Sequence, residues 1–270
     1  MYASKDGCGF WRAFLIALMF QFFLFGLCIT LFPYVRGYIV DRAIEGDARS
    51  FLVQMGEIEP VENPHGTIPE IETQVQETFR DYERLWADMT AYNERIYAQH
   101  QSGLSCEYDY QQPSFVLKNY GLTSEIFGVI SIPAMELEMP IYLGATSQHM
   151  ADGAAHMTQT SLPIGGKNTN AVIAGHRGYN GASYFRYIDK LQPGDLVTVR
   201  NLWETLQYRV SGIKIIDPHD VEEILIQDGR VLLTLITCHP YASGGKQRHV
   251  VYCERVPDAL YGYLNPLPPL

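Results

Sequence analysis

Val231-Leu232-Leu233-Thr234-Leu235-Ile236-Thr237-Cys238 is an apolar, β-branched run that ends in a cysteine. Alternation along a strand places Cys238 on the same face as Leu232, Thr234 and Ile236, where the strand meets its loop. The pattern predicts a buried strand that presents a thiol at its end. A purely structural cysteine is the alternative, because cysteines are often buried in protein cores.

Shorter runs of the same kind stand before and after this strand, and turn residues such as Pro193-Gly194-Asp195 separate most of them. The runs are 129–132, 140–142, 171–174, 196–199, 206–210, 213–216, 231–236 and 250–252. Eight strands in about 130 residues predict a mainly β fold, a closed barrel or a sandwich. A short helix is expected around Ser183 to Lys190.

Two polar residues next to other predicted strands complete a candidate catalytic set with Cys238. His176 follows Val172 and Ala174 at strand spacing, and Arg248 stands two residues before another β-branched run. A thiolate can attack a carbonyl, an imidazole can move protons, and a guanidinium can hydrogen-bond a developing oxyanion. The set therefore predicts acyl transfer through a thioester. Arg255 is a nearby competitor for the role of Arg248.

The N-terminal part contains a continuous apolar run from Ala13 to Phe32. At ~1.5 Å per residue this run spans about 30 Å, the thickness of a bilayer core. It is long for a signal-peptide core and is followed by no small-x-small cleavage site, so we interpret it as a retained anchor, with cleavage as the alternative. The short N-terminal flank places the N-terminus in the cytoplasm and the large domain outside.

The segment between the anchor and the barrel shows three patterns. Residues 33–67 are expected to be irregular, because Pro60, Pro64 and Gly66 interrupt them. Apolar residues then recur at helical spacing from Ile68 to Ile96, which predicts an amphipathic helix packed on the domain. A polar and aromatic stretch from 103 to 122 shows neither period, and such loops often act as lids.

Composition excludes several functions. A net charge of −10 argues against nucleic acid as a partner, and the sequence contains no Walker loop, no GxGxxG and no CxxC. No cofactor or metal is expected, and His149 and His156 are interpreted as solvated loop residues. A disulfide between Cys106 and Cys253 is compatible with an exported domain, although two free thiols are preferred.

The ordered motifs of residues 128–256 resemble those of the sortase family, and of its class C, pilus-assembling branch in particular. The motifs are Gly128-Val129-Ile130-Ser131-Ile132-Pro133, Leu137-Glu138-Met139-Pro140-Ile141-Tyr142, Thr160-Ser161-Leu162-Pro163-Ile164-Gly165-Gly166, Gly175-His176-Arg177-Gly178, Thr234 to Cys238 with Pro240-Tyr241, and Arg248. The resemblance implies an eight-stranded sortase β-barrel. It also implies cleavage of an LPxTG-like sorting signal after threonine and transfer to an amine, usually a pilin lysine in class C.

The resemblance assigns catalysis to Cys238, His176 and Arg248, and makes Thr237 and Tyr241 candidates for the substrate groove. Class C enzymes usually carry a lid with an Asp-Pro-aromatic motif. Asp109-Tyr110 is the nearest analogue here and lacks the proline. An open site is the alternative. No partner beyond a sorting-signal protein, the amine acceptor and the membrane is implied.

The predicted organisation has six parts. They are a cytoplasmic N-terminus at 1–12, a transmembrane anchor at 13–32, an extracellular helical extension at 33–102, a lid loop at 103–127, the catalytic barrel at 128–258 and a tail at 259–270. Three other interpretations compete: a sortase of another class that uses cell-wall amines, a hydrolytic cysteine peptidase, and a non-catalytic membrane-tethered binding module. A papain-like enzyme would place its cysteine ahead of its histidine, which is the reverse of the order here.

Overall fold

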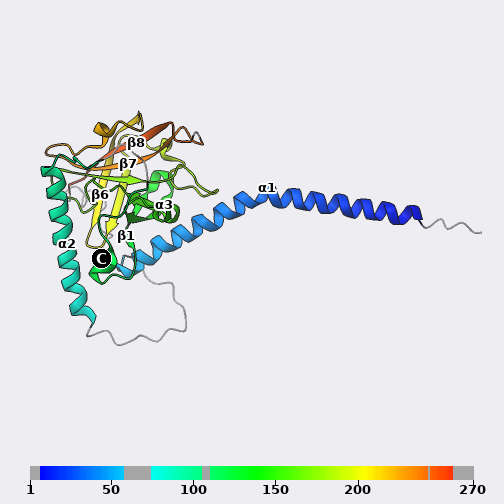
Figure 1. Ribbon diagram of the computed structural model, residues 1–270, viewed down its shortest axis with the longest axis horizontal. Helices are drawn as coiled ribbons and strands as arrows, with labels where there is room; N and C mark the ends of the chain where they lie inside the picture. Colours follow the sequence, from blue (N-terminus) through cyan, green and yellow to red (C-terminus); the bar gives the residue numbers. More distant parts are fainter. Residues whose placement is uncertain (1–6, 58–73, 105–109, 243, 258–270) are drawn as a thin grey trace, which may run out of the picture.

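The computed structural model describes residues 7–57, 74–104, 110–242 and 244–257 (Figure 1). Within these residues eight strands form one closed barrel in the order β1-β2-β3-β4-β7-β8-β6-β5, which confirms the predicted fold class. The strands are β1 (Ile126–Ile132), β2 (Leu137–Leu143), β3 (Ala154–His156), β4 (Thr169–Ala174), β5 (Leu196–Asn201), β6 (Thr205–Ile216), β7 (Val231–His239) and β8 (Gln247–Arg255). Pairing is parallel between β2 and β3 and between β4 and β7.

The number of strands was predicted correctly, but two of the individual assignments were wrong. The runs at 206–210 and 213–216 belong to one strand, β6, whose pairing with β8 shifts register between Val210 and Gly212 and then continues. A β-bulge of this kind bends a strand without ending it. The missing strand is β3, whose three residues Ala154-Ala155-His156 carry no β-branched side chain.

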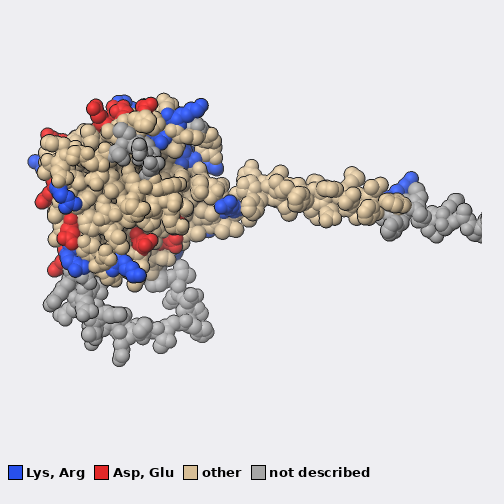
Figure 2. Space-filling view, in the orientation of Figure 1, with Lys and Arg blue, Asp and Glu red and all other residues tan. Residues whose placement is uncertain are grey.

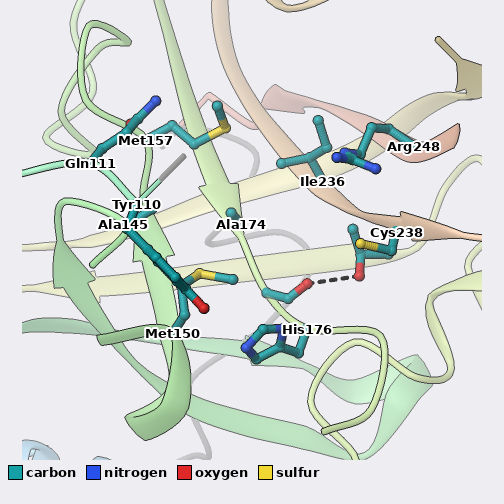
Figure 3. A pocket seen from close by; sticks show the side chains of 12 residues that line it. Tyr110, Gln111, Ala145, Met150, Met157, Ala174, His176, Ile236, Cys238 and Arg248 are labelled. Carbon is teal, nitrogen blue, oxygen red and sulfur yellow. Dashed lines mark hydrogen bonds between the residues drawn. The ribbon is translucent and has the colours of Figure 1, made fainter. Parts of the chain in front are cut away.

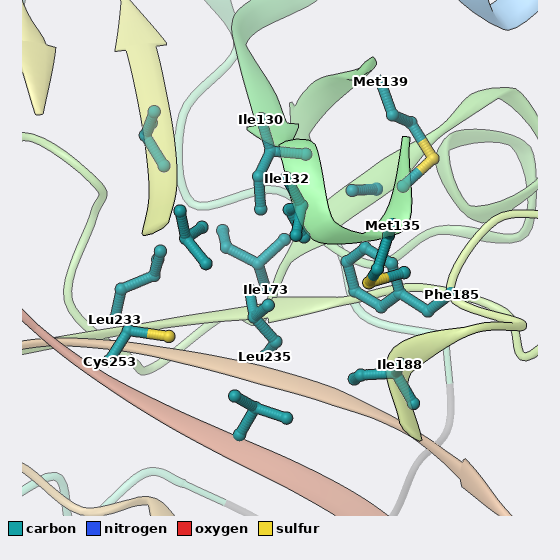
Figure 4. Close-up of a cluster of buried hydrophobic side chains, with 14 of the residues drawn as sticks. Ile130, Ile132, Met135, Met139, Ile173, Phe185, Ile188, Leu233, Leu235 and Cys253 are labelled. Atoms are coloured by element: carbon teal, nitrogen blue, oxygen red, sulfur yellow. The ribbon is translucent and has the colours of Figure 1, made fainter. Parts of the chain in front are cut away.

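The core of the barrel follows from alternation along the strands. Leu233 and Leu235 of β7 belong to a buried cluster with Ile130 and Ile132 of β1 and Ile173 of β4 (Figure 4). Ile236 belongs to a different buried cluster, together with Val172 and Val250. The two faces of β7 are therefore both covered. Cys238 follows Ile236 at strand spacing, and Thr237 follows Leu235.

Three α-helices and four short 3₁₀-helices occur in the described part of the chain. They are α1 (Gly7–Gln54), α2 (Gln74–Ala98), α3 (Ser147–Asp152), η1 (Leu117–Tyr120), η2 (Pro133–Met135), η3 (Ile188–Lys190) and η4 (Val221–Ile224). The amphipathic helix is confirmed as α2, which buries Leu85, Met89 and Ile96; its predicted start at Ile68 lies outside the described residues. The helix expected around Ser183 to Lys190 is reduced to turns and η3.

The prediction that residues 33–67 are irregular was wrong for the part that the structure describes. Helix α1 continues through Pro33 to Gln54. Its last part buries Ile44, Ala48 and Phe51, which recur at helical spacing and join the apolar clusters of the domain. Burial of this stripe stabilises the helix. The prolines that suggested a loop come later, outside the described residues.

The first part of α1 projects away from the barrel (Figure 1). Its large apolar side chains from Trp11 to Ile39 are exposed, and Figure 2 shows that charged side chains are almost absent along it. Among the described residues, Phe14–Gln54 is long and apolar enough to cross a membrane. A helix that is apolar on every side and uncovered by protein has the character of a membrane-spanning segment.

Candidate active site

The thiol and the guanidinium lie side by side on neighbouring strands. Cys238 of β7 and Arg248 of β8 are directly opposite each other in the antiparallel pairing. Gly245, in the loop that joins the two strands, lies beside both. A Cβ atom on Gly245 would stand 3.0 Å from Arg248 Nη1 and 3.4 Å from Cys238 Sγ. The absence of a side chain at this position leaves room for the two groups to face a common space.

Arg248 is held by the loop that it closes. Its side chain is buried, and its Nη1 donates to the Gly245 carbonyl at 2.6 Å and to the Gln247 carbonyl at 3.1 Å. These bonds fix the orientation of the planar guanidinium. A fixed, planar set of donors suits recognition of a carbonyl or an oxyanion better than a flexible ammonium does.

His176 reaches the same place because β4 and β7 run parallel. Ala174 pairs with Ile236, and His176 and Cys238 each stand two residues beyond that pair. Two hydrogen bonds join the strand ends: the Thr237 hydroxyl donates to the Gly175 carbonyl at 2.7 Å, and the Gly175 N–H donates to the Ile236 carbonyl at 3.2 Å. The imidazole and the thiol are therefore attached to one rigid edge.

The imidazole of His176 is packed between two tyrosines. Its ring stacks on Tyr179 with 4.4 Å between centroids and an angle of 21°. Tyr184 meets it edge-on, with centroids 5.8 Å apart. Burial lowers the pKa of His176 below its ordinary value, because desolvation disfavours the imidazolium. The ring is therefore mainly neutral at pH 7 and can take a proton from a thiol or an amine.

The three side chains line one pocket of about 190 Å³ (Figure 3). Its wall is mostly apolar, as suits an apolar peptide segment. The remaining lining residues are Tyr110, Gln111, Ala145, Met150, Met157, Ala174, Gly175, Ile236 and Thr237. The structure thus brings Cys238 and Arg248 together with His176, which stands far from both in the sequence.

Tyr110, one of the two predicted lid residues, lies on this pocket. Figure 3 shows its side chain extending toward the part of the pocket that holds His176. The neighbouring Gln111 fixes the segment, since its N–H donates to the Ala145 carbonyl at 2.9 Å and its side-chain oxygen accepts from the Thr158 N–H at 2.7 Å. Asp109 lies outside the described residues.

The two predicted groove residues have different positions. Thr237 lines the pocket, but its hydroxyl is engaged with Gly175. Tyr241 is half exposed and is not among the residues that line the pocket. Its ring packs on the guanidinium of Arg186, and its hydroxyl accepts from Arg186 at 2.6 Å. Tyr241 therefore stands beside the site, at the loop that follows His176.

The prediction that His149 and His156 are solvated loop residues was wrong. His156 is fully buried on β3, and burial lowers its pKa to about 4. His149 is on α3, stacked on Tyr142 with centroids 5.0 Å apart. Sequence reasoning missed α3 and with it Met150 of the pocket. Thr146 was the available signal, because its side chain accepts from the His149 N–H as an N-cap.

Cys253 is the other cysteine of the barrel that the structure describes. Cys253 is a free thiol buried in the barrel, and burial raises its pKa. Its proposed disulfide partner, Cys106, lies outside the described residues. Within the part of the chain that the structure describes, no group of three His, Cys, Asp or Glu side chains could hold a metal ion.

Comparison with known proteins agrees with the fold. The model of the sortase domain family matches residues 130–256. The solved structure of the pilus-related sortase C of Group B Streptococcus is 30% identical, with a TM-score of 0.59 over 67% of this chain and 92% of that chain. Sortase C-1 from Streptococcus pneumoniae is 26% identical, with a TM-score of 0.62 over 78% of this chain and 98% of that chain.

A curated relative, sortase D of Bacillus subtilis, is 28% identical over 136 residues, which are 50% of this chain and 66% of the relative. The match thus covers slightly less than two thirds of that relative's length. The chain belongs to the sortase family, whose members are cysteine transpeptidases, and its solved structural neighbours are pilus-related class C sortases.

Proposed function

We propose that the chain is a membrane-anchored cysteine transpeptidase that cleaves an LPxTG-like sorting signal and joins the new carboxyl end to an amine. The observation that carries this proposal is the convergence of Cys238, His176 and Arg248 on one apolar pocket. The Cys238 thiolate attacks the threonine carbonyl carbon, and Arg248 donates hydrogen bonds to the oxyanion that forms. His176, which takes the proton of the Cys238 thiol as the thiolate forms, gives that proton to the leaving amine as the C–N bond breaks, which leaves a thioester on Cys238.

The second half of the reaction reverses these roles. An incoming amine attacks the thioester, His176 removes its proton, and the thiolate of Cys238 leaves as the new amide forms. The name of the Group B Streptococcus structure, a pilus-related sortase C, favours a pilin lysine as the acceptor. Water as acceptor would make the enzyme a peptidase, and a cell-wall amine would make it a surface-protein anchoring enzyme.

The N-terminal helix supports a place at the cell membrane. The exposed apolar part of α1 would span the bilayer at about residues 13–32, and the barrel would lie outside the cell, where surface proteins are assembled. Tyr110 would act as part of a lid, because its side chain occupies the same pocket as the catalytic set.

The test uses a fragment that begins at Pro33, mixed with an LPxTG-type peptide and followed by protein mass. We expect an acyl adduct on Cys238 that transfers to an added amine. Cys238→Ala is the matched control and should stay at its own mass. A lysine-bearing pilin peptide and a small cell-wall amine are compared as acceptors, which separates the two kinds of transpeptidase. Absence of an adduct, both with a pilin-derived signal and in Tyr110→Ala, would contradict the proposal.

A further inference from the structure

The N-terminal helix touches the loop that carries the candidate catalytic histidine. We call residues 175–187, which follow β4, the histidine loop. Gly181 of this loop meets α1 backbone against backbone: a Cβ atom on Gly181 would lie 2.3 Å from the Pro33 carbonyl oxygen. In return, a Cβ atom on Gly37 would lie 2.4 Å from the Gly181 carbonyl oxygen. This close approach needs glycine on both sides.

One turn further along α1, a carboxylate binds the same loop. Asp41 Oδ1 accepts from the Ser183 N–H at 2.8 Å, and Asp41 Oδ2 accepts from the Ser183 hydroxyl at 3.3 Å. Both carboxylate oxygens are therefore bound to one residue of the histidine loop. A carboxylate that accepts from a backbone N–H makes a strong, charge-assisted bond that fixes the backbone at that point.

The next two residues connect this point with His176. Tyr184 adopts a left-handed backbone with φ of 42°, which is rare for a tyrosine. Its buried ring meets the His176 ring edge-on, and its hydroxyl donates to the Ala151 carbonyl at 2.6 Å. The Phe185 N–H donates to the His176 carbonyl at 2.9 Å. Ser183, which Asp41 binds, thus directly precedes the residue whose ring packs against the imidazole.

We propose that Asp41 is a positioning residue for His176, so that the segment of α1 next to the membrane is part of the active-site framework. This inference rests on the proposed function. Asp41 is not among the residues that line the pocket, and both of its carboxylate oxygens are bound to Ser183. It acts through Ser183 and Tyr184, which hold the imidazole in place and keep it partly dry.

A purely structural role for Asp41 predicts different results. If Asp41 only fastened α1 to the domain, its loss would lower stability and leave the chemistry of the remaining folded molecules unchanged. If Asp41 positions the imidazole, its loss loosens Tyr184 and admits water. The pKa of His176, now lowered by burial, would then rise toward the ordinary value of 6.5, and turnover would fall.

The experiment uses the full chain in detergent micelles, with Asp41→Ala, Asp41→Asn and, as the matched control on the same helix, Asp47→Ala. In Asp41→Ala we expect kcat to fall about tenfold, with the KM for the sorting peptide within about twofold. Asp41→Asn should recover most of the activity, because its side-chain oxygen still accepts from the Ser183 N–H. Asp47→Ala should behave as the unmodified chain.

A second readout does not depend on turnover. The pKa of His176 is measured by NMR in Cys238→Ala, with and without Asp41→Ala, and we expect it to rise when the carboxylate is removed. That rise would support the positioning role even if the chain transferred no acyl group. An unchanged pKa, or an unchanged kcat in an active enzyme, would overturn it. If Asp41→Ala does not fold, Asp41→Glu, whose carboxylate is displaced by one methylene, should change both readouts in the same direction.

Discussion

At the scale of single residues, the chemistry depends on how each group is oriented. Arg248 illustrates this, because its guanidinium bonds to two carbonyls of its own loop and still lines the pocket beside Cys238. If the site needed only a positive charge, lysine would suit it equally well. Of the two, only arginine has a planar side chain that its several hydrogen-bond donors can fix at once.

Arg248→Lys should therefore lower kcat/KM for the sorting peptide by about 100-fold, the usual effect of losing one oxyanion donor. The matched control is Arg255→Lys on the same strand, which lies outside the pocket lining and should keep nearly full activity. Steady-state kinetics of both variants with one peptide would decide the matter. Full activity in Arg248→Lys would remove Arg248 from the proposed mechanism.

The three candidate catalytic residues could be predicted because each lies within two residues of a strand end, where apolar alternation gives way to a polar group. The environment of His176 could not be predicted in this way. Tyr179 and Tyr184 reach the imidazole through a loop whose shape depends on contacts with α1, and no local pattern contains that information. Met157 and Gln111 likewise enter the pocket from irregular segments.

At the scale of elements, β3 shows how a buried polar residue can define a strand that propensity does not favour. His156 Nε2 lies 3.0 Å from the Ser161 carbonyl oxygen and 3.3 Å from that of Thr160, so the proton of the neutral ring belongs on Nε2. Nδ1 is buried and, within the described residues, has no partner. A second proton at Nδ1 would find no acceptor, in agreement with the lowered pKa.

The pKa of His156 makes stability depend on pH. The folded value of about 4 lies below the ordinary value of 6.5, so between these values the unfolded chain binds more protons. The stabilisation is complete above pH 6.5 and is lost as pH falls toward 4. Between pH 7 and 5 this residue should cost about 2 kcal/mol of unfolding free energy.

His156→Gln removes the titrating group and keeps a donor toward Ser161. Urea unfolding of the fragment from Pro33 at pH 7 and pH 5 should show a loss smaller by about 2 kcal/mol in this variant. The exposed His100→Gln is the control and should lose as much as the unmodified fragment. Equal losses in all three proteins would mean that His156 does not titrate as its burial requires.

The elements themselves were predictable where a period was long and clear. Helix α2 and strand β7 have such periods, and both were predicted correctly. Strand β6 was divided in two because Ser211-Gly212 looks like a turn in sequence, whereas β8 pairs on both sides of it. The second half of α1 was missed because its apolar stripe packs on a barrel that is formed by residues more than 70 positions later.

At the scale of the whole molecule, α1 joins two environments in one continuous helix. The histidine loop contacts α1 at Pro33 and Gly37, directly after the apolar run that ends at Phe32. Gly37 lies about 8 Å along the helix from Phe32, at ~1.5 Å per residue. If residues 13–32 cross the bilayer, the candidate active site stands close to the membrane surface, at a height that the helix fixes.

The short N-terminal flank predicts the orientation of this helix, with the N-terminus inside and the barrel outside. In intact protoplasts that express the full chain with a tag at each end, added protease should remove the C-terminal tag and leave the N-terminal tag, which becomes accessible only after lysis. The apolar part of α1 is uncovered by protein on every side, so the chain should also stay with the membrane during an alkaline wash. If the C-terminal tag is protected from protease before lysis, the orientation is the opposite one. If the alkaline wash releases the chain, α1 does not span the bilayer.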